Sequence, residues 1–193
     1  MIAPSIILAS TSVYRRQLLE RFGLPFEVIG PKVSEAPLPG EDPRSLVRRL
    51  AEAKARSVAL DHPGALVIGS DQVAVLDGEI IGKPGTMGRA IGQLRAFSRR
   101  TVDFPTGICC LRRDAECQVD VVMTRVHFRT LDEDRITRYV ERDTPLDCAG
   151  SFKSEGLGIT LFERIEGDDP TALMGLPLIR LGRMLEQAGV SLY

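Results

Sequence analysis

The amino-acid sequence predicts an α/β fold with a mixed sheet, and three patterns indicate it. Short apolar runs typical of strands alternate with segments whose apolar residues recur at helical spacing. Apolar residues on both sides of Asp77-Gly78 predict a β-hairpin, because this dipeptide suits a tight turn between antiparallel strands. Two longer apolar runs, 102–111 and 117–128, predict a second, extended hairpin. Strand–helix units combined with antiparallel hairpins are typical of a mixed sheet flanked by helices.

The N-terminal half alternates predicted strands with predicted helices. Ser12 is a candidate N-cap for a helix that ends near Gly23. Asp42-Pro43 supplies a cap and a first-turn proline for a helix that reaches about Leu60. Residues 30–41 are rich in Pro and Gly and predict a loop. The predicted strands of this half are 5–10, 26–29 and 65–69.

The C-terminal half carries further boundary signals. A helix is predicted over 86–98, and the sequence from Thr130 to Glu133 has the form of a capping box that starts a helix to about Arg142. A strand is expected at 159–165 and a closing helix at 176–187.

Composition limits the class of protein. A chain of 193 residues fits one domain, or one domain split into two lobes around a cleft. Its net charge of −1 argues against a general nucleic-acid binder, which normally carries a basic excess. The apolar run at residues 5–9 is too short for a signal peptide or a membrane span, so we expect a cytoplasmic protein without a membrane partner.

The four cysteines have no paired metal-binding spacing. Cys109 and Cys110 are adjacent, so in a strand they face opposite sides of the sheet. Together with Cys117 and Cys148 they are interpreted as free thiols in a reducing compartment.

Lysine is rare in this chain, which makes its positions informative. Of the 25 basic residues only Lys32, Lys54, Lys83 and Lys153 are lysines. Each surviving lysine either meets a need for a compact ammonium that a planar guanidinium does not satisfy, or is a chance surface residue. For Lys32 the surface interpretation is preferred.

Three segments are candidates for ligand chemistry. The first, residues 8–16, runs from a strand into a helix through small hydroxyl residues. Its unpaired amide groups and the helix dipole favour an anion, to which Arg15 adds a bidentate contact. The alternative is a plain Ser12 cap beside solvated arginines.

The second segment is Gly69-Ser-Asp-Gln72. Asp71, placed directly after an apolar strand, suits a metal ligand or a general base for water, although an ordinary turn aspartate is the alternative. Lys83 follows the hairpin that Asp71 introduces and returns toward the same edge. Glu35 and Lys54 are further polar candidates, which spacing alone does not single out.

The third segment is residues 147–156, where two glycines bracket small and charged residues. This composition suits a loop lying close against a ligand, or simply a surface turn.

Several short motifs in this order resemble the Maf family of nucleotide pyrophosphatases over nearly the whole chain. They are Leu8-Ala-Ser-Thr-Ser12, Gly69-Ser-Asp-Gln72, Gly82-Lys-Pro84, Thr106-Gly107 and Ala149-Gly-Ser151. The resemblance implies a single domain over 1–193, with a two-lobed fold related to inosine-triphosphate pyrophosphatases, usually a homodimer. It also implies cleavage of a nucleoside triphosphate between its α and β phosphates with a divalent cation, Mg²⁺ or Mn²⁺.

Residue roles follow from the same resemblance. Asp71 matches the catalytic acidic residue and, with Glu35, a metal-binding pair. Ser10, Arg15, Lys54 and Lys83 match positions associated with phosphate or metal binding and are taken as substrate-binding residues.

The resemblance also favours a substrate. Tyr14 before Arg15-Arg16, and Glu155 in the late loop, are similar to the subgroup that hydrolyses 7-methyl-GTP, where Tyr14, Gln72 and Glu155 are expected to select the base. Methylated guanine is a cationic ring, which an aromatic face and a carboxylate both favour. Val13 and Tyr14 depart from the subgroup's usual proline and tryptophan. A dTTP/UTP pyrophosphatase and a nucleotide-binding regulator of cell division are the alternatives.

Overall fold

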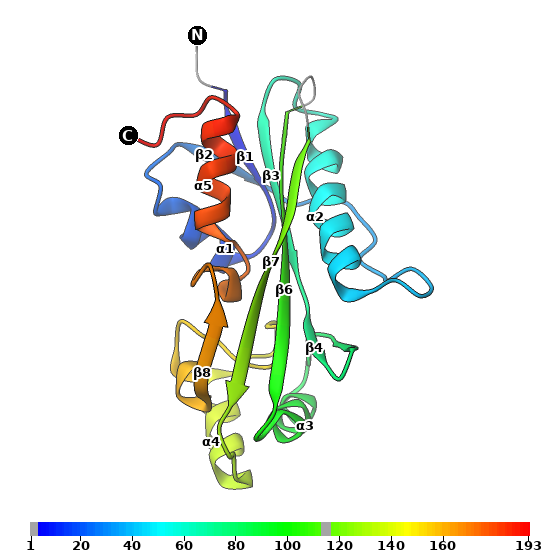
Figure 1. The fold of residues 1–193 in the computed structure, drawn as a ribbon, viewed down its shortest axis with the longest axis vertical. Coiled ribbons are helices and arrows are strands. Elements are labelled where there is room, and N and C mark those ends of the chain that lie inside the picture. Colours follow the sequence, from blue (N-terminus) through cyan, green and yellow to red (C-terminus); the bar gives the residue numbers. More distant parts are fainter. Residues whose placement is uncertain (1–3, 113–116) are drawn as a thin grey trace. The chain divides into compact units, whose positions relative to one another are not determined.

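The computed structural model describes residues 4–112 and 117–193, whose chain path is drawn in Figure 1. The chain divides into two compact units. The first unit is made of Met1–Asp71, Thr106–Val122 and Asp169–Tyr193, and the second unit of Gln72–Pro105 and Met123–Asp168. Two units built around a mixed sheet agree with the predicted two-lobed organisation.

The strands and helices follow the predicted order closely. The strands are β1 Ile6–Ala9, β2 Phe26–Ile29, β3 Leu66–Gln72, β4 Ala74–Leu76, β5 Glu79–Ile81, β6 Thr101–Arg112, β7 Gln118–Phe128 and β8 Phe162–Gly167. The α-helices are α1 Val13–Glu20, α2 Pro43–Ala59, α3 Met87–Phe97, α4 Glu133–Asp143 and α5 Leu178–Gln187, with short 3-10 helices at Leu157–Leu161 and Ala172–Met174.

The sheet is mixed, as predicted. Its strand order is β2-β1-β3-β6-β4-β5, and β7 pairs with both β6 and β8. β1 runs parallel to β2 and to β3, whereas β4–β5, β4–β6 and β7–β8 are antiparallel pairs. The parallel part belongs to the first unit.

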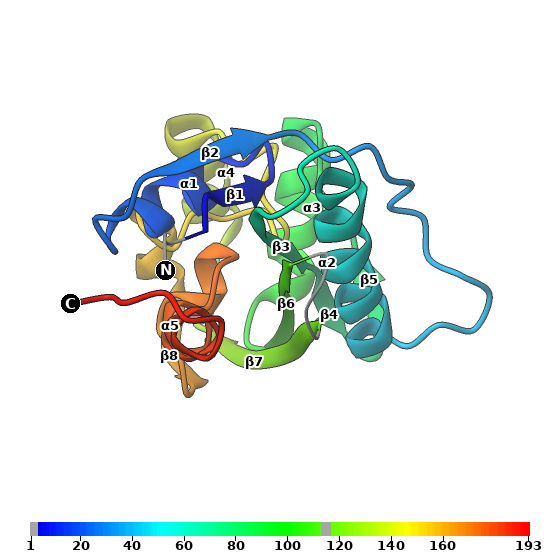
Figure 2. The same cartoon turned by 90° about the horizontal axis from the view of Figure 1, so that it is seen from above.

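In the first unit, alternating side chains of the sheet supply two separate cores. Ile6 and Leu8 of β1 pack with α1 and α5, whereas Ile7 and Ala9 pack with α2. Helices therefore cover both faces of the parallel strands, as Figure 2 shows. This arrangement follows from the two-residue period of a strand, which points successive side chains to opposite faces.

Two glycines let α2 lie directly on the sheet. A Cβ at Gly69 of β3 would lie 2.1 Å from the carbonyl oxygen of Ala51. A Cβ at Gly107 of β6 would lie 2.1 Å from the carbonyl oxygen of Val47. Since real Cβ atoms do not approach that closely, only glycine permits this helix–sheet distance.

The second unit is held by a cluster of aromatic rings. Neighbouring rings in it have centroids 4.8 to 5.8 Å apart and tilted or edge-on contacts; its members are Phe97, Phe104, Phe128, Phe152 and Phe162. A Cβ at Gly150 would lie 2.9 Å from the Phe104 ring, and its φ is 78°. The loop after α4 therefore needs glycine there to pack on the cluster.

Four predicted boundaries were wrong in detail. β3 continues through Asp71 and Gln72 instead of ending at residue 69. The N-cap of α4 is Asp132, whose carboxylate accepts the Arg135 N–H at 2.7 Å, not Thr130. Residues 157–161 form a 3-10 turn closed by a bond from the Thr160 hydroxyl to the Leu157 carbonyl, so β8 starts at 162.

The fourth boundary is the start of α5, which lies at Leu178, not 176. The Asp169 carboxylate accepts the N–H groups of Ile179 at 2.7 Å and Arg180 at 3.4 Å, and so caps α5 from outside the helix. Among the described residues, no helix combines the length and the apolar character needed to cross a membrane.

The buried thiols lie as predicted, on opposite faces of β6. Cys109 belongs to the core under α2 and Cys110 to the core under α1 and α5. Burial raises the pKa of the Cys110 thiol to about 12, and burial also raises that of Cys109 far above its usual value. Both thiols therefore stay protonated in the folded protein from pH 7 to pH 9.

The rate at which each cysteine is alkylated in the native protein should depend on its burial, because the thiolate is the reactive form and burial disfavours it. At pH 8 we expect an alkylating reagent to modify the half-buried Cys117 and Cys148 at least about 100-fold faster than Cys109 and Cys110. Mass spectrometry of the labelled peptides measures each rate, and denatured protein provides the control. Equal rates at all four cysteines in the native protein would contradict the prediction.

Candidate active site

Asp71, Lys54 and Glu35 form a charged cluster in the first unit. The Lys54 Nζ atom donates to Asp71 Oδ1 at 2.5 Å and lies 2.6 Å from Glu35 Oε1. Lys54 and Asp71 are only 5% and 6% exposed, whereas the Glu35 side chain is 58% exposed. A buried ammonium is therefore paired with two carboxylates, one of which reaches the solvent.

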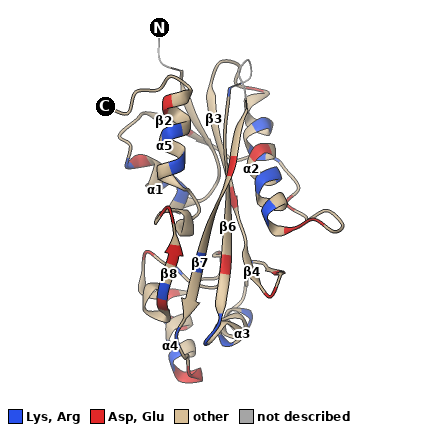
Figure 3. Ribbon diagram, viewed as in Figure 1, with Lys and Arg blue, Asp and Glu red and all other residues tan. Residues whose placement is uncertain are grey.

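The periods of a strand and a helix explain why these groups meet. Gly69 faces α2, so Asp71, two residues further along β3, faces α2 as well. Lys54 lies one turn of α2 beyond Ala51, which touches Gly69. Asp71 therefore lies within the strand, not directly after it as predicted. The charged residues of α2 are mostly basic (Figure 3), with Glu52 as its one acidic residue, and Lys54 is the buried cation among them.

The opposite face of β3 carries Ser70. Its hydroxyl lies 2.7 Å from the Gly107 carbonyl and 2.8 Å from the Gly175 carbonyl. Arg15 Nε donates to the same Gly175 carbonyl at 2.9 Å. Gly175 has a φ of 97° and a Cβ there would meet Arg15 Nε at 3.2 Å, so glycine is required beside the guanidinium.

Arg15 is half-buried and interacts electrostatically with Asp71 and Glu35. Burial lowers the pKa of its guanidinium, and the charges of Asp71 and Glu35 act in the opposite direction. The group stays cationic at any physiological pH, since guanidinium does not deprotonate in proteins. The predicted residues Arg15, Glu35, Lys54 and Asp71 thus belong to one electrostatically coupled group.

The strand–helix turn after β1 has the predicted form. Ser10 is 3% exposed, and its hydroxyl accepts the Ser12 N–H at 3.1 Å. The Ser12 hydroxyl accepts the Arg15 N–H at 3.4 Å and caps α1. Tyr14 lies half-buried in the first turn of that helix. The cap interpretation of Ser12 is therefore confirmed, and it coexists with an inward-facing Arg15.

The remaining predicted residues belong to the second unit. Gln72 follows Asp71 in β3 and is half-buried, while Lys83 and Glu155 are exposed. Their part in substrate binding stays a prediction. Lys153 has a structural contact instead: its Nζ donates to the Asp143 carbonyl at 2.7 Å, near the C-terminus of α4.

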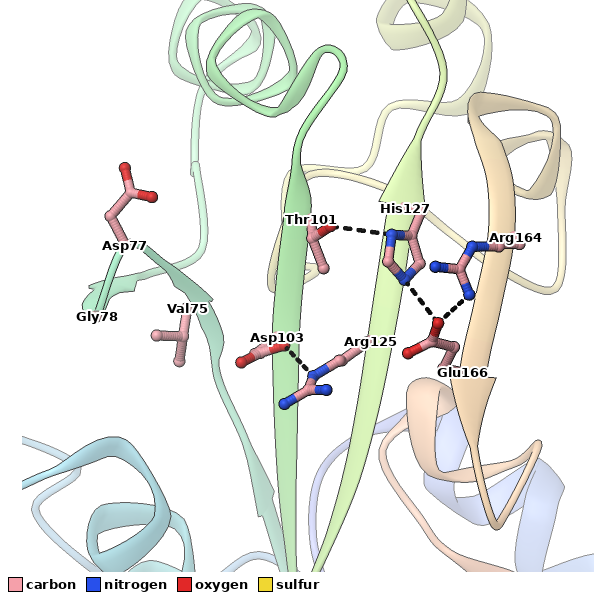
Figure 4. A pocket seen from close by; sticks show the side chains of 9 residues that line it. All are labelled: Val75, Asp77, Gly78, Thr101, Asp103, Arg125, His127, Arg164 and Glu166. Atoms are coloured by element: carbon pink, nitrogen blue, oxygen red, sulfur yellow. Dashed lines mark hydrogen bonds and ion pairs between the residues drawn. The ribbon is translucent and has the colours of Figure 1, made fainter.

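The second unit also has a polar hollow of about 460 Å³, shown in Figure 4. Two ion pairs lie in it, Arg125 with Asp103 at 3.2 Å and Arg164 with Glu166, and His127 Nε2 lies 3.3 Å from the Glu166 carboxylate. Burial and the nearby arginines Arg164 and Arg125 lower the pKa of His127. The hollow lies on the polar outer face of β6, β7 and β8, and His127 belongs to β7.

Two carboxylates are available for a divalent cation. Asp71 and Glu35 both point at the Lys54 ammonium, so their oxygens lie close to one another. Hard cations such as Mg²⁺ use one or two carboxylates together with water and substrate phosphates, so this pair fits such an ion. Among the residues that the structure describes, no group of three or more His, Cys, Asp or Glu side chains forms a larger metal site.

Some residues that shape the site had been assigned no role from the sequence. Ser70 and Thr106 lay inside recognised motifs, and the Thr106 hydroxyl donates to the Ala172 carbonyl at 3.1 Å. Gly175 and Asp169 carried no comparable signal. Gly175 contacts Arg15 and Ser70, which are distant in the chain, and Asp169 bonds to N–H groups ten and eleven residues further on, so only the folded structure identifies these contacts.

Comparison with known proteins agrees with this fold and these motifs. Residues 5–188 match the family model described as Maf-like protein. A protein of Aromatoleum aromaticum named 7-methyl-GTP pyrophosphatase is 58% identical over 97% of this chain and 97% of its own. A protein of Pseudomonas aeruginosa with the same name is 56% identical over 98% of this chain and 99% of its own.

Solved structures with little sequence similarity share the fold. The Ham1 protein of Staphylococcus aureus superposes with a TM-score of 0.54 at 18% identity, covering 95% of this chain and 99% of that one. A HAM1 protein of Coxiella burnetii gives a TM-score of 0.55 at 16% identity and the same coverage. By its matched residues and its close relatives, this chain belongs to the Maf-like protein family.

Proposed function

We propose that this protein is a nucleotide pyrophosphatase that hydrolyses 7-methyl-GTP to 7-methyl-GMP and diphosphate. The observation that carries the proposal is the Asp71–Lys54–Glu35 cluster, with Asp71 and Lys54 buried, in a chain 58% identical to a protein named 7-methyl-GTP pyrophosphatase. Binding phosphates alone needs no buried acidic group, whereas hydrolysis needs a group that accepts a proton from water. The proposal places the enzyme in the cytoplasm as a homodimer.

Each charged residue has a role in this reaction. Water attacks the α-phosphorus, the bond to the bridging oxygen breaks, and diphosphate leaves. The Asp71 carboxylate accepts the proton of the attacking water, as a general base. Asp71 and Glu35 would hold a Mg²⁺- or Mn²⁺-type cation, which when bound withdraws charge from the phosphate oxygens.

The cationic groups compensate the charge of the leaving group. Lys54 and Arg15 are oriented before substrate arrives, by Asp71 and by the Gly175 carbonyl respectively. Oriented charges in a site from which water is excluded stabilise a transition state more than mobile ones do. Lys83 and Ser10 complete the proposed phosphate-binding set.

Base selection is assigned to Tyr14, Gln72 and Glu155. The 7-methylguanine ring carries a positive charge, which an aromatic face and a carboxylate attract. Unmethylated GTP lacks this charge, so the proposal predicts a preference between the two nucleotides.

A nucleotide panel tests the proposal. Diphosphate release is measured with 7-methyl-GTP, GTP, dTTP and UTP, each with Mg²⁺, with Mn²⁺ and with a chelator. We expect kcat/KM for 7-methyl-GTP to exceed that for the others by about 10-fold or more, and activity to vanish with the chelator. A preference for dTTP or UTP would contradict the substrate, and tight nucleotide binding without turnover would support a regulatory protein.

A further inference from the structure

Glu35 lies on a segment that has no helix or strand of its own. Residues 30–42 form an irregular connection between β2 and α2. The Glu35 side chain is 58% exposed, yet its carboxylate lies 2.6 Å from the buried Lys54 ammonium. An exposed carboxylate on an irregular segment keeps one position only if the backbone around it is held.

Arg49 of α2 holds the part of the segment that follows Glu35. Its Nε and Nη2 atoms donate to the two oxygens of Glu41 at 2.6 and 2.7 Å, and Nη2 also donates to the Ala36 carbonyl at 3.2 Å. Glu41 Oε2 accepts the Leu38 N–H at 3.0 Å. One guanidinium thus joins the residue next to Glu35 to the start of α2.

The chemistry of this contact requires arginine. Only a planar guanidinium donates two parallel bonds to one carboxylate and still has a donor for a carbonyl. The Glu41 side chain is 8% exposed, and the hydrogen bonds from Arg49 and from Leu38 lower the pKa of its carboxyl group. Glu41 is therefore ionised at neutral pH, where its carboxylate accepts all three of these bonds.

The same helix carries the partner of Glu35. Lys54 follows Arg49 by five residues on α2, and after the bonds to Glu41 the negative charge of Asp71 also contributes to a raised pKa of Arg49. Two residues of α2 therefore hold this part of the chain. Lys54 contacts the Glu35 carboxylate, and Arg49 contacts the backbone next to Glu35. Both contacts lie within the first unit.

We propose that Arg49, acting through Glu41 and the Ala36 carbonyl, is a positioning residue that holds Glu35 against Lys54 and Asp71. This inference rests on the proposed function for the role of Glu35 in the reaction. Whether Arg49 fixes the position of Glu35 is a property of the fold and is testable without substrate.

A set of paired variants tests it. Arg49→Lys keeps the charge, and so leaves any through-space attraction to Glu35, but removes the fork. Glu41→Gln weakens the same pair of bonds between Arg49 and Glu41 from the other side. Each is combined with Glu35→Gln, and Arg56→Lys is the matched control, because Arg56 makes two bonds to Glu52 on the same helix without touching the segment.

The first measurement is the midpoint of unfolding by urea. Positioning predicts that Arg49→Lys and Glu35→Gln together lower the midpoint by less than the sum of the two single shifts, since removing either frees the same segment. Arg56→Lys with Glu35→Gln should give an additive shift. Additive shifts for both Arg49→Lys and Glu41→Gln would overturn the proposal.

The second measurement is kcat/KM for the best nucleotide. We expect Arg49→Lys to lower it about 10-fold in the unmodified chain and less than about two-fold in the Glu35→Gln chain, with Arg56→Lys changing neither. An equal loss in both backgrounds would overturn a positioning role in the reaction. If the unmodified chain hydrolyses no nucleotide, the proposed function fails. The unfolding midpoints of the single and double variants then decide whether Arg49 holds Glu35.

Discussion

The Asp71→Asn variant is expected to hydrolyse its best nucleotide at least about 1000-fold more slowly than the unmodified chain. The amide has nearly the same size as the carboxylate but neither accepts the proton of water nor offers a charged ligand to a cation. Initial rates of diphosphate release at saturating metal measure the loss.

The fold of this variant should survive, which separates loss of chemistry from loss of structure. The Lys54 ammonium keeps Glu35 as a charged partner, so it does not become a buried charge without compensation. Circular dichroism and the unfolding midpoint check this point. Asp103→Asn is the matched control, because Asp103 is an ion-paired aspartate of β6 in the second unit, and its activity should stay within about two-fold.

A variant that keeps a tenth or more of the activity would remove Asp71 from the proposed mechanism. The carboxylate would then be a structural partner of Lys54 only. Loss of activity together with loss of the native circular dichroism spectrum would be attributed to folding, and the rate would then have to be measured on the folded fraction.

Replacing Gly69 with Ala should strongly destabilise the protein. The new Cβ would lie 2.1 Å from the Ala51 carbonyl oxygen and 2.8 Å from the Ala55 amide nitrogen, both backbone atoms of α2. Because neither can rotate away, the whole helix must shift from the sheet. We expect the free energy of unfolding to fall by about 3 kcal/mol or more.

The same shift should also lower activity. α2 carries Lys54, so moving the helix away from β3 separates the ammonium from Asp71. Urea unfolding followed by circular dichroism measures the stability, and diphosphate release measures the activity. An unchanged unfolding midpoint would show that α2 does not lie as close to Gly69 as the structure has it.

Gly92→Ala provides the control for this prediction. Gly92 lies inside α3, and a Cβ there would meet nothing within 4 Å. Alanine favours helix over glycine by about 1 kcal/mol, so this variant should be slightly more stable than the unmodified chain. The same chemical change is thus expected to have opposite signs at the two positions.

Most element boundaries were predictable because they depend on neighbours in the sequence. Ser12, Asp42 and Thr86 each cap the helix that follows by accepting an N–H group two or three residues further on. Asp77-Gly78 forms the turn of a hairpin with positive φ at both residues. The cap of α5 was missed because its acceptor, Asp169, stands ten residues before the N–H group of Ile179.

The sequence named the charged residues of the proposed site, but not their geometry. The resemblance to the Maf family names Arg15, Glu35, Lys54 and Asp71 as site residues, and the structure joins them electrostatically. That Asp71 lies inside β3 and bonds to Lys54 follows from the register of a helix against a sheet. No local pattern encodes that register, since it depends on Gly69 and Gly107 meeting α2.

The sequence by itself therefore determined the order of strands and helices and the mixed sheet. Local hydrogen bonds and the periods of strand and helix are sufficient for these features. Only the tertiary structure decided that Lys54 joins Asp71 to Glu35, and that Arg15 shares the Gly175 carbonyl with Ser70. Arg15 and Gly175 are 160 residues apart, and such contacts arise from the packing of whole elements, which no local sequence pattern records.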